Sequence, residues 1–93
     1  MTIGLCRLEL YLPECGSLKQ KRSVIKSLTT RVRNKFNVSV SELEDNDLWQ
    51  KALVGVVTVS NDSRHANQVL SKVVDMVERE DRLMLMDYSL ELL

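Results

Sequence analysis

The sequence predicts an α+β fold, a ferredoxin-like βαββαβ sandwich with two helices on one face of a four-stranded antiparallel sheet. Apolar and polar residues alternate in the first two strand segments, a third segment is rich in Val, and apolar residues recur at helical spacing in two others. With a fourth strand over residues 83–92, these segments follow one another as strand, helix, strand, strand, helix, strand. The 93 residues contain one Pro and three Gly, so no flexible linker divides the chain. We therefore expect a single domain over residues 1–93.

The first predicted strand and helix have clear boundaries. Residues 3–12 are expected to form a strand because apolar and polar side chains alternate from Cys6 onward. Pro13 and Gly16 end it, and Ser17 is a suitable N-cap for a helix over residues 18–35. The apolar side chains of this helix recur at helical spacing: Leu18, Val24, Ile25, Leu28 and Val32.

The second half of the chain repeats this order. A second strand is expected from Phe36, the polar run 42–47 is expected to turn the chain, and a Val-rich third strand follows over 49–60. Asn61, Asp62 and Ser63 offer caps for the second helix, and residues 83–92 form the fourth strand. The apolar stripe of the second helix is Ala66, Val69, Leu70, Val73, Met76 and Val77. Right-handed crossovers place the first and third strands in the centre, each as the parallel neighbour of the strand across its helix.

Because both helices cover one face, the other face of the sheet is open. The side chains expected there are Leu5, Arg7, Glu9, Tyr11, Ser39, Ser41 and Leu43. The third strand is apolar on both faces, so either the set 53, 57 and 59 or the set 52, 54 and 56 faces outward. Apolar surface on an open face is typical of an interface, and homo-oligomerisation through the sheet is the simplest explanation.

The charges are segregated along the chain, although the formal net charge is zero. Residues 1–40 carry a net charge of +6, and residues 41–93 carry −6. Between Cys15 and Ser41 there is no Asp or Glu, and the basic residues there are Lys19, Lys21, Arg22, Lys26, Arg31, Arg33 and Lys35. Such an asymmetric field favours a charged partner.

A helical projection places four of these cations in one row. Lys19, Arg22, Lys26 and Arg33 fall within about 60° of one another, and the row could follow a phosphate backbone. Lys21 projects into the apolar arc and is expected to extend its stem across the core edge towards solvent. Arg31 and Lys35 lie on the opposite flank. The predicted nucleic-acid-binding residues are Lys19, Lys21, Arg22, Lys26 and Arg33. The alternative is a helix face that is merely solvated.

The sequence shows no catalytic constellation, so we expect no enzyme activity, cofactor or metal. The single histidine, His65, is expected to be a helix-start residue, and Cys6 and Cys15 are expected to be core or incidental thiols. The acidic run Glu42, Glu44, Asp45 and Asp47 lacks the order of a calcium loop and is expected to be a solvated hairpin tip, or to meet the basic helix of another copy.

Nothing in the sequence indicates a membrane span or a signal peptide, and reduced cysteines suit the cytoplasm, where we expect the protein to act.

Several stretches together resemble the YlxP-like family of small bacterial proteins. They are Leu8-Glu9-Leu10, Leu12-Pro13, 17–22 (SLKQKR), 33–40 (RNKFNVSV), 47–50 (DLWQ) and 60–65 (SNDSRH). The resemblance implies a ferredoxin-like fold. Genes of this family often lie near those for translation initiation and ribosome maturation, which implies a role on ribosomal RNA or the small ribosomal subunit. It implies no active site.

Two hypotheses follow. The first is a non-enzymatic RNA- or ribosome-associated protein that contacts phosphates through its first helix. The second is a homodimeric protein-interaction module that uses the open sheet face. Base stacking on the sheet is disfavoured, because Tyr11 is the one aromatic residue expected on the open face of a central strand.

Overall fold

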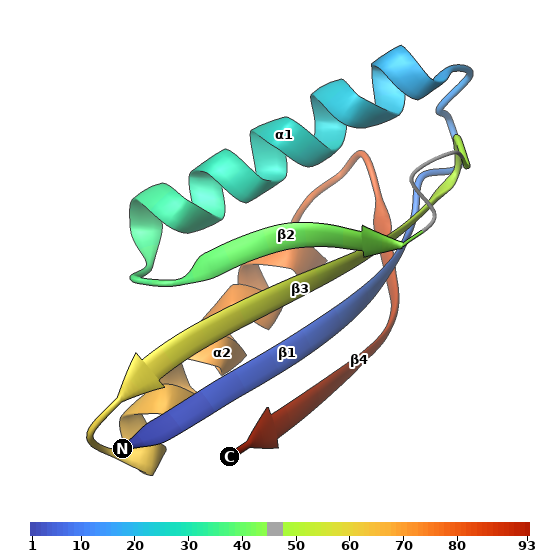
Figure 1. Cartoon of the computed structure of the whole chain (residues 1–93). Helices are drawn as coiled ribbons and strands as arrows, with labels where there is room; N and C mark the ends of the chain where they lie inside the picture. The colour runs from blue at the N-terminus through green and yellow to red at the C-terminus, as the bar shows by residue number, and fades with distance from the viewer. Residues whose placement is uncertain (45–47) are drawn as a thin grey trace.

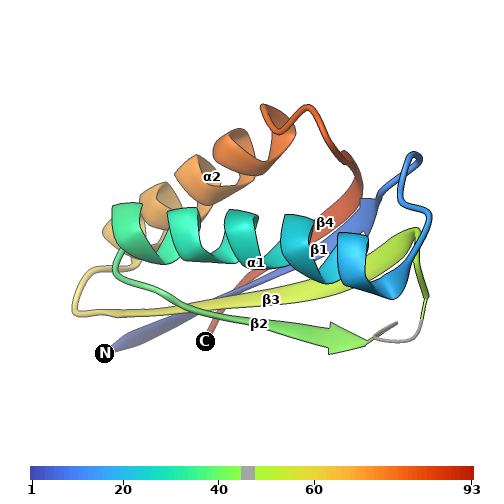
Figure 2. The same ribbon diagram turned by 90° about the horizontal axis from the view of Figure 1, so that it is seen from above.

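The structure is a computed structural model that describes residues 1–44 and 48–93, and it contains the predicted elements in the predicted order (Figure 1). The elements are β1 (Thr2–Tyr11), α1 (Leu18–Lys35), β2 (Ser39–Glu44), β3 (Lys51–Ser60), α2 (Ser63–Glu78) and β4 (Met84–Leu92). Figure 2 shows α1 and α2 on the same side of the sheet. The ferredoxin-like α+β fold is confirmed.

Side-chain caps start both helices where the sequence predicts. Ser17 Oγ accepts a hydrogen bond from the Gln20 amide at 3.1 Å, and Asp62 Oδ1 accepts one from the Arg64 amide at 2.9 Å. At the other end of α1, the Phe36 amide still donates to the Val32 carbonyl at 2.9 Å. The second strand therefore begins at Ser39, later than predicted, because the last turn of the helix holds Phe36.

Two further boundaries differ from the prediction. Glu42 was expected in the turn between the second and third strands, but it lies within β2. The third strand begins at Lys51 and not at Trp49. The second strand thus ends later, and the third begins later, than predicted. Backbone pairing with a neighbouring strand, and not side-chain polarity, decides where a strand ends.

The strand order is β2-β3-β1-β4, which confirms that β1 and β3 are central. The expectation that each is the parallel neighbour of the strand across its helix was wrong, since all neighbouring pairs are antiparallel. Each crossover skips one position in the sheet. β3 fills the gap between β1 and β2, and β1 fills the gap between β3 and β4.

The core lies between the sheet and the helices, and it decides the phase of β3. Ala52, Val54 and Val56 are buried opposite the apolar side chains of β1, so Val57 and Val59 face outward. The helix α2 approaches β1 closely at Gly4. A Cβ at this position would lie 2.8 Å from Leu70 Cδ1, so a larger residue here would force the Leu70 side chain to move.

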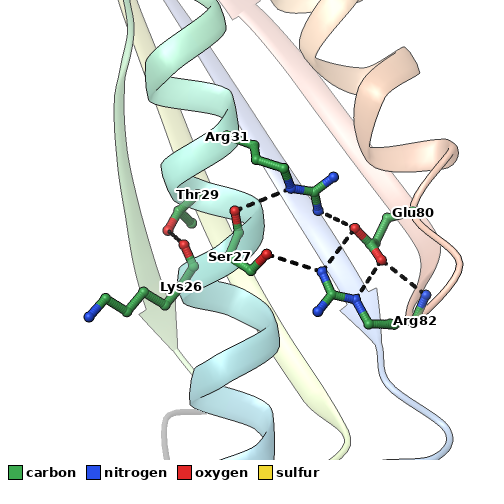
Figure 3. A network of polar contacts seen from close by, with 6 residues as sticks. All are labelled: Lys26, Ser27, Thr29, Arg31, Glu80 and Arg82. Carbon is green, nitrogen blue, oxygen red and sulfur yellow. Dashed lines mark hydrogen bonds and ion pairs between the residues drawn. The ribbon is translucent and has the colours of Figure 1, made fainter.

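A polar cluster joins α1 to the turn after α2 (Figure 3). The Glu80 carboxylate accepts hydrogen bonds from Arg82 Nε at 2.8 Å and from the Arg31 guanidinium of α1. Arg82 Nη2 also donates to Ser27 Oγ at 3.2 Å. The Glu80 side chain is only 7% exposed, whereas both arginines remain about half in solvent.

These contacts stabilise the ionised carboxylate. Hydrogen bonds from Arg82, and then from Arg31, lower the pKa of Glu80 from 4.5 to about 2 against the opposing effect of burial. The pKa is lower in the folded chain than in the unfolded chain. The stability that this group contributes is therefore fully present above about pH 4.5 and is lost as the pH falls towards 2.

We expect Glu80→Gln to lower the free energy of unfolding at neutral pH by about 1–2 kcal/mol, a figure reduced for the solvent exposure of both arginines. The difference between the variant and the unmodified protein should shrink as the pH falls from 4.5 to 2. Urea denaturation followed by circular dichroism at several pH values measures it. Glu78→Gln, at an exposed position on α2, is the control, and a pH-independent difference for Glu80→Gln would contradict the assignment.

Candidate functional site

The predicted row of cations lies on the outer flank of α1, the helix that packs over the edge strand β2 (Figure 1). Lys19, Arg22 and Lys26 are all exposed. Arg33 is also exposed, and its Nη2 donates a hydrogen bond to the Val40 carbonyl of β2 at 2.8 Å. A carbonyl is neutral, so this bond orients the guanidinium without cancelling its charge. The four cations span about 20 Å of helix at 1.5 Å per residue.

Lys21 does not belong to this row. Its side chain is 1% exposed, and its Nζ lies 2.9 Å from Glu42 Oε2. The expected extension towards solvent was wrong, because Glu42 on the core face of β2 provides a carboxylate directly beneath the helix. A buried ammonium paired in this way cannot reach a phosphate outside, so the structure removes Lys21 from the predicted interface.

The opposite flank of α1 faces α2 and has a mixed charge. Arg31 binds Glu80, and the Lys35 ammonium lies 5.8 Å from the centroid of the Phe36 ring. These residues border a shallow groove of about 350 Å³ between the helices, which Asp75 also lines. Carboxylates therefore accompany the cations on this flank, unlike on the outer one.

The ion pairs show which cations the acidic residues contact. Among the side chains that the structure describes, Glu42 pairs with Lys21, and Glu80 pairs with Arg31 and Arg82. Within the same set of residues, no ion pair reaches the four exposed cations of the outer flank. The outer flank of α1 thus retains its positive charge.

The sequence did not predict which carboxylates pair with the cations of α1. Glu42 was assigned to a solvated hairpin tip, but it lies on β2 beneath α1 of its own chain. Asp45 and Asp47, assigned to the same tip, lie outside the described residues. No sequence pattern indicated that Glu80 and Arg82 would contact α1, because the contact joins segments far apart in the chain.

The remaining candidate residues lie as follows. His65 is exposed in the first turn of α2, as expected for a helix-start residue. Cys6 and Cys15 are free and buried, which confirms that they are core thiols. Burial raises the pKa of the Cys6 thiol to about 11, so almost no nucleophilic thiolate forms at neutral pH. Within residues 1–44 and 48–93, no group of three His, Cys, Asp or Glu side chains could hold a metal ion.

Neither helix in the described part of the chain is long and apolar enough to cross a membrane.

The family described as "Protein of unknown function (DUF503)" matches residues 3–90. The chain belongs to the DUF503 family. One relative is "Uncharacterized protein YlxP" of Bacillus subtilis (strain 168), which is 40% identical over 76 residues, covering 82% of this chain and 83% of the relative. The resemblance to YlxP-like proteins in the sequence is confirmed.

The burial of Lys21 predicts a difference between two lysines of the same helix. Lys21→Met should lower the free energy of unfolding by about 3 kcal/mol, because it leaves the largely buried Glu42 carboxylate without its ammonium. Lys19→Met, at an exposed position, should change stability by less than about 0.5 kcal/mol. Urea denaturation at neutral pH measures both, and equal losses would show that Lys21 has no special structural role.

Proposed function

We propose that this protein binds structured RNA, such as ribosomal RNA, through the outer flank of α1. Lys19, Arg22 and Lys26 contact phosphates, and Arg33 extends the row towards the end of the helix. One observation carries the proposal: these cations are exposed on one flank and have no acidic partner among the described residues. The contribution of the protein is association and not chemistry on the RNA.

The spacing of the row suits a phosphate backbone. Lys19, Arg22 and Lys26 follow one another at intervals of about 4.5 and 6 Å along the helix axis. Cations that neutralise phosphates release counterions, so affinity depends steeply on salt. Contacts of this kind position a protein on RNA and read its shape more than its sequence.

Two further points favour RNA over another polyanion. The resemblance to YlxP-like proteins implies genes near those for translation initiation and ribosome maturation, and ribosomal RNA would place the protein in the cytoplasm. The open sheet face is a poor base-stacking platform, because among the described residues Tyr11 of β1 is the one aromatic side chain that its two central strands place there. The β3 side chains that face outward there are Lys51, Leu53, Val57 and Val59, none of them aromatic.

The charge-reversal variant Arg22→Glu/Lys26→Glu should abolish binding to small-subunit ribosomal particles and structured RNA. For the unmodified protein, three or four neutralised phosphates give a slope of log affinity against log salt of about −2 to −4 between about 50 and 200 mM salt. Fluorescence anisotropy with labelled RNA measures the slope, and co-sedimentation measures binding to particles.

Arg64→Glu/Lys72→Glu is the matched control, since it makes the same charge change at exposed positions of α2. Circular dichroism shows whether each variant is folded. Full RNA binding by folded Arg22→Glu/Lys26→Glu would refute the proposed surface. Salt-independent binding by the unmodified protein would refute the phosphate contacts.

A further inference from the structure

The face of the sheet that neither helix covers in Figure 2 carries large apolar side chains in solvent. Val59 of β3 is 61% exposed, Met86 of β4 is 60% exposed and Leu43 of β2 is 46% exposed. Leu43 lies over Gly55, where a Cβ would come within 2.9 Å of its Cδ1. Apolar groups from three of the four strands thus share one open surface, as is typical of an interface.

Two opposite charges, Arg7 and Glu9 of β1, lie in the middle of this surface beside a third charge, Asp87 of β4. Arg7 is paired across the sheet with Gly55 and Ser89, and Glu9 is paired with Leu53 and Asp87. The side chains of Arg7 and Glu9 are both exposed. Within the described residues, neither takes part in an ion pair.

We infer that two copies of this chain pack sheet to sheet about a two-fold axis that crosses the strands between Arg7 and Glu9. Such an axis places Arg7 of each copy opposite the partner's Glu9. Facing sheets lie about 10 Å apart, a gap that these long side chains bridge from both sides. The charges that are unpaired in one chain then form two equivalent ion pairs in the dimer.

The same axis matches the flanking strands. On β3, it brings Leu53 opposite the partner's Gly55, where the partner's Leu43 lies. On β4, Asp87 faces the partner's Ser89. The two-fold rotation therefore places neither Glu9 nor Asp87 opposite its own copy in the partner. An axis that runs along β1 would instead lay the apolar β3 column on the column of Asp87 and Glu91, and Arg7 on the partner's Arg7. Charge complementarity therefore favours the first axis over this one.

The shapes of the two ends are also complementary. At one end of the open face, Val59 projects from β3. At the other end lie two adjoining hollows of about 460 and 670 Å³, which share Tyr11 and Lys51 in their walls. Trp49 lines the larger hollow. The two-fold axis carries the projecting end of one copy onto the hollow end of the other.

The area available sets the expected affinity. Four strands of up to ten residues, at about 3.3 Å per residue and 4.8 Å between strands, give a face of roughly 500–600 Å². A standard interface buries about 800 Å² per partner. The dimer should therefore be reversible, with a dissociation constant in the micromolar range or weaker, and concentrated protein is needed to observe it.

Sedimentation velocity over about 10–500 μM tests the inference with three variants. Arg7→Glu and Glu9→Arg each oppose like charges, so each should raise the dissociation constant at least about tenfold. The double variant Arg7→Glu/Glu9→Arg exchanges the two charges and should restore dimerisation to within about threefold. Recovery by exchange is specific to an interface in which residue 7 faces residue 9.

Three controls make the result decisive. Arg64→Glu, an exposed reversal on α2, and Arg22→Glu/Lys26→Glu, on the opposite layer, should both dimerise like the unmodified protein. Circular dichroism verifies folding, and Glu9→Arg serves if Arg7→Glu does not fold. A monomer at every concentration would overturn the inference, as would a dimer that both single variants leave intact. Neither outcome bears on RNA binding by α1.

Discussion

Two helices cover one face of a four-stranded sheet, and every strand must divide its side chains between that face and the other. In β1, Leu8 and Leu10 are buried beneath the helices, whereas Arg7 and Glu9 face away. Because both crossover connections have the same hand, α1 and α2 must lie on the same side. The core, the open surface and the exposed flank of α1 all follow from this one-sided cover.

The charges of the chain are used in two ways. Carboxylates that arrive from β2 and from the turn after α2 meet cations of α1 on its inward side, at Lys21 and Arg31. These contacts fasten a helix that packs over an edge strand and contacts α2 only sparsely. Among the described residues, Lys19, Arg22 and Lys26 on the outward side take part in no ion pair, and Arg33 bonds a neutral carbonyl of β2. No carboxylate within this set offsets their mutual repulsion.

The two inferred surfaces lie on opposite layers of the molecule. In the inferred dimer the sheets meet in the middle and both copies of α1 remain outside. Such a particle presents two separate basic flanks, one on each side. If each flank engages RNA, a single RNA with two suitably placed backbone segments gains affinity through effective concentration without any new contact. Each surface can nevertheless act alone.

Three features can be predicted from the amino-acid sequence alone: the order of the elements, the start of both helices and the set of side chains on the open face of β1. Local signals suffice for these features. Ser17 and Asp62 cap their helices, and successive side chains of β1 point to opposite faces of the sheet. A helical projection of the sequence also predicts which cations of α1 share a flank. The phase of β3, which is apolar on both faces, and the burial of Lys21 depend instead on how the elements pack together. A helical projection gives the direction of a side chain but not what lies beneath it, and the carboxylate that pairs with Lys21 comes from a strand brought there by the fold.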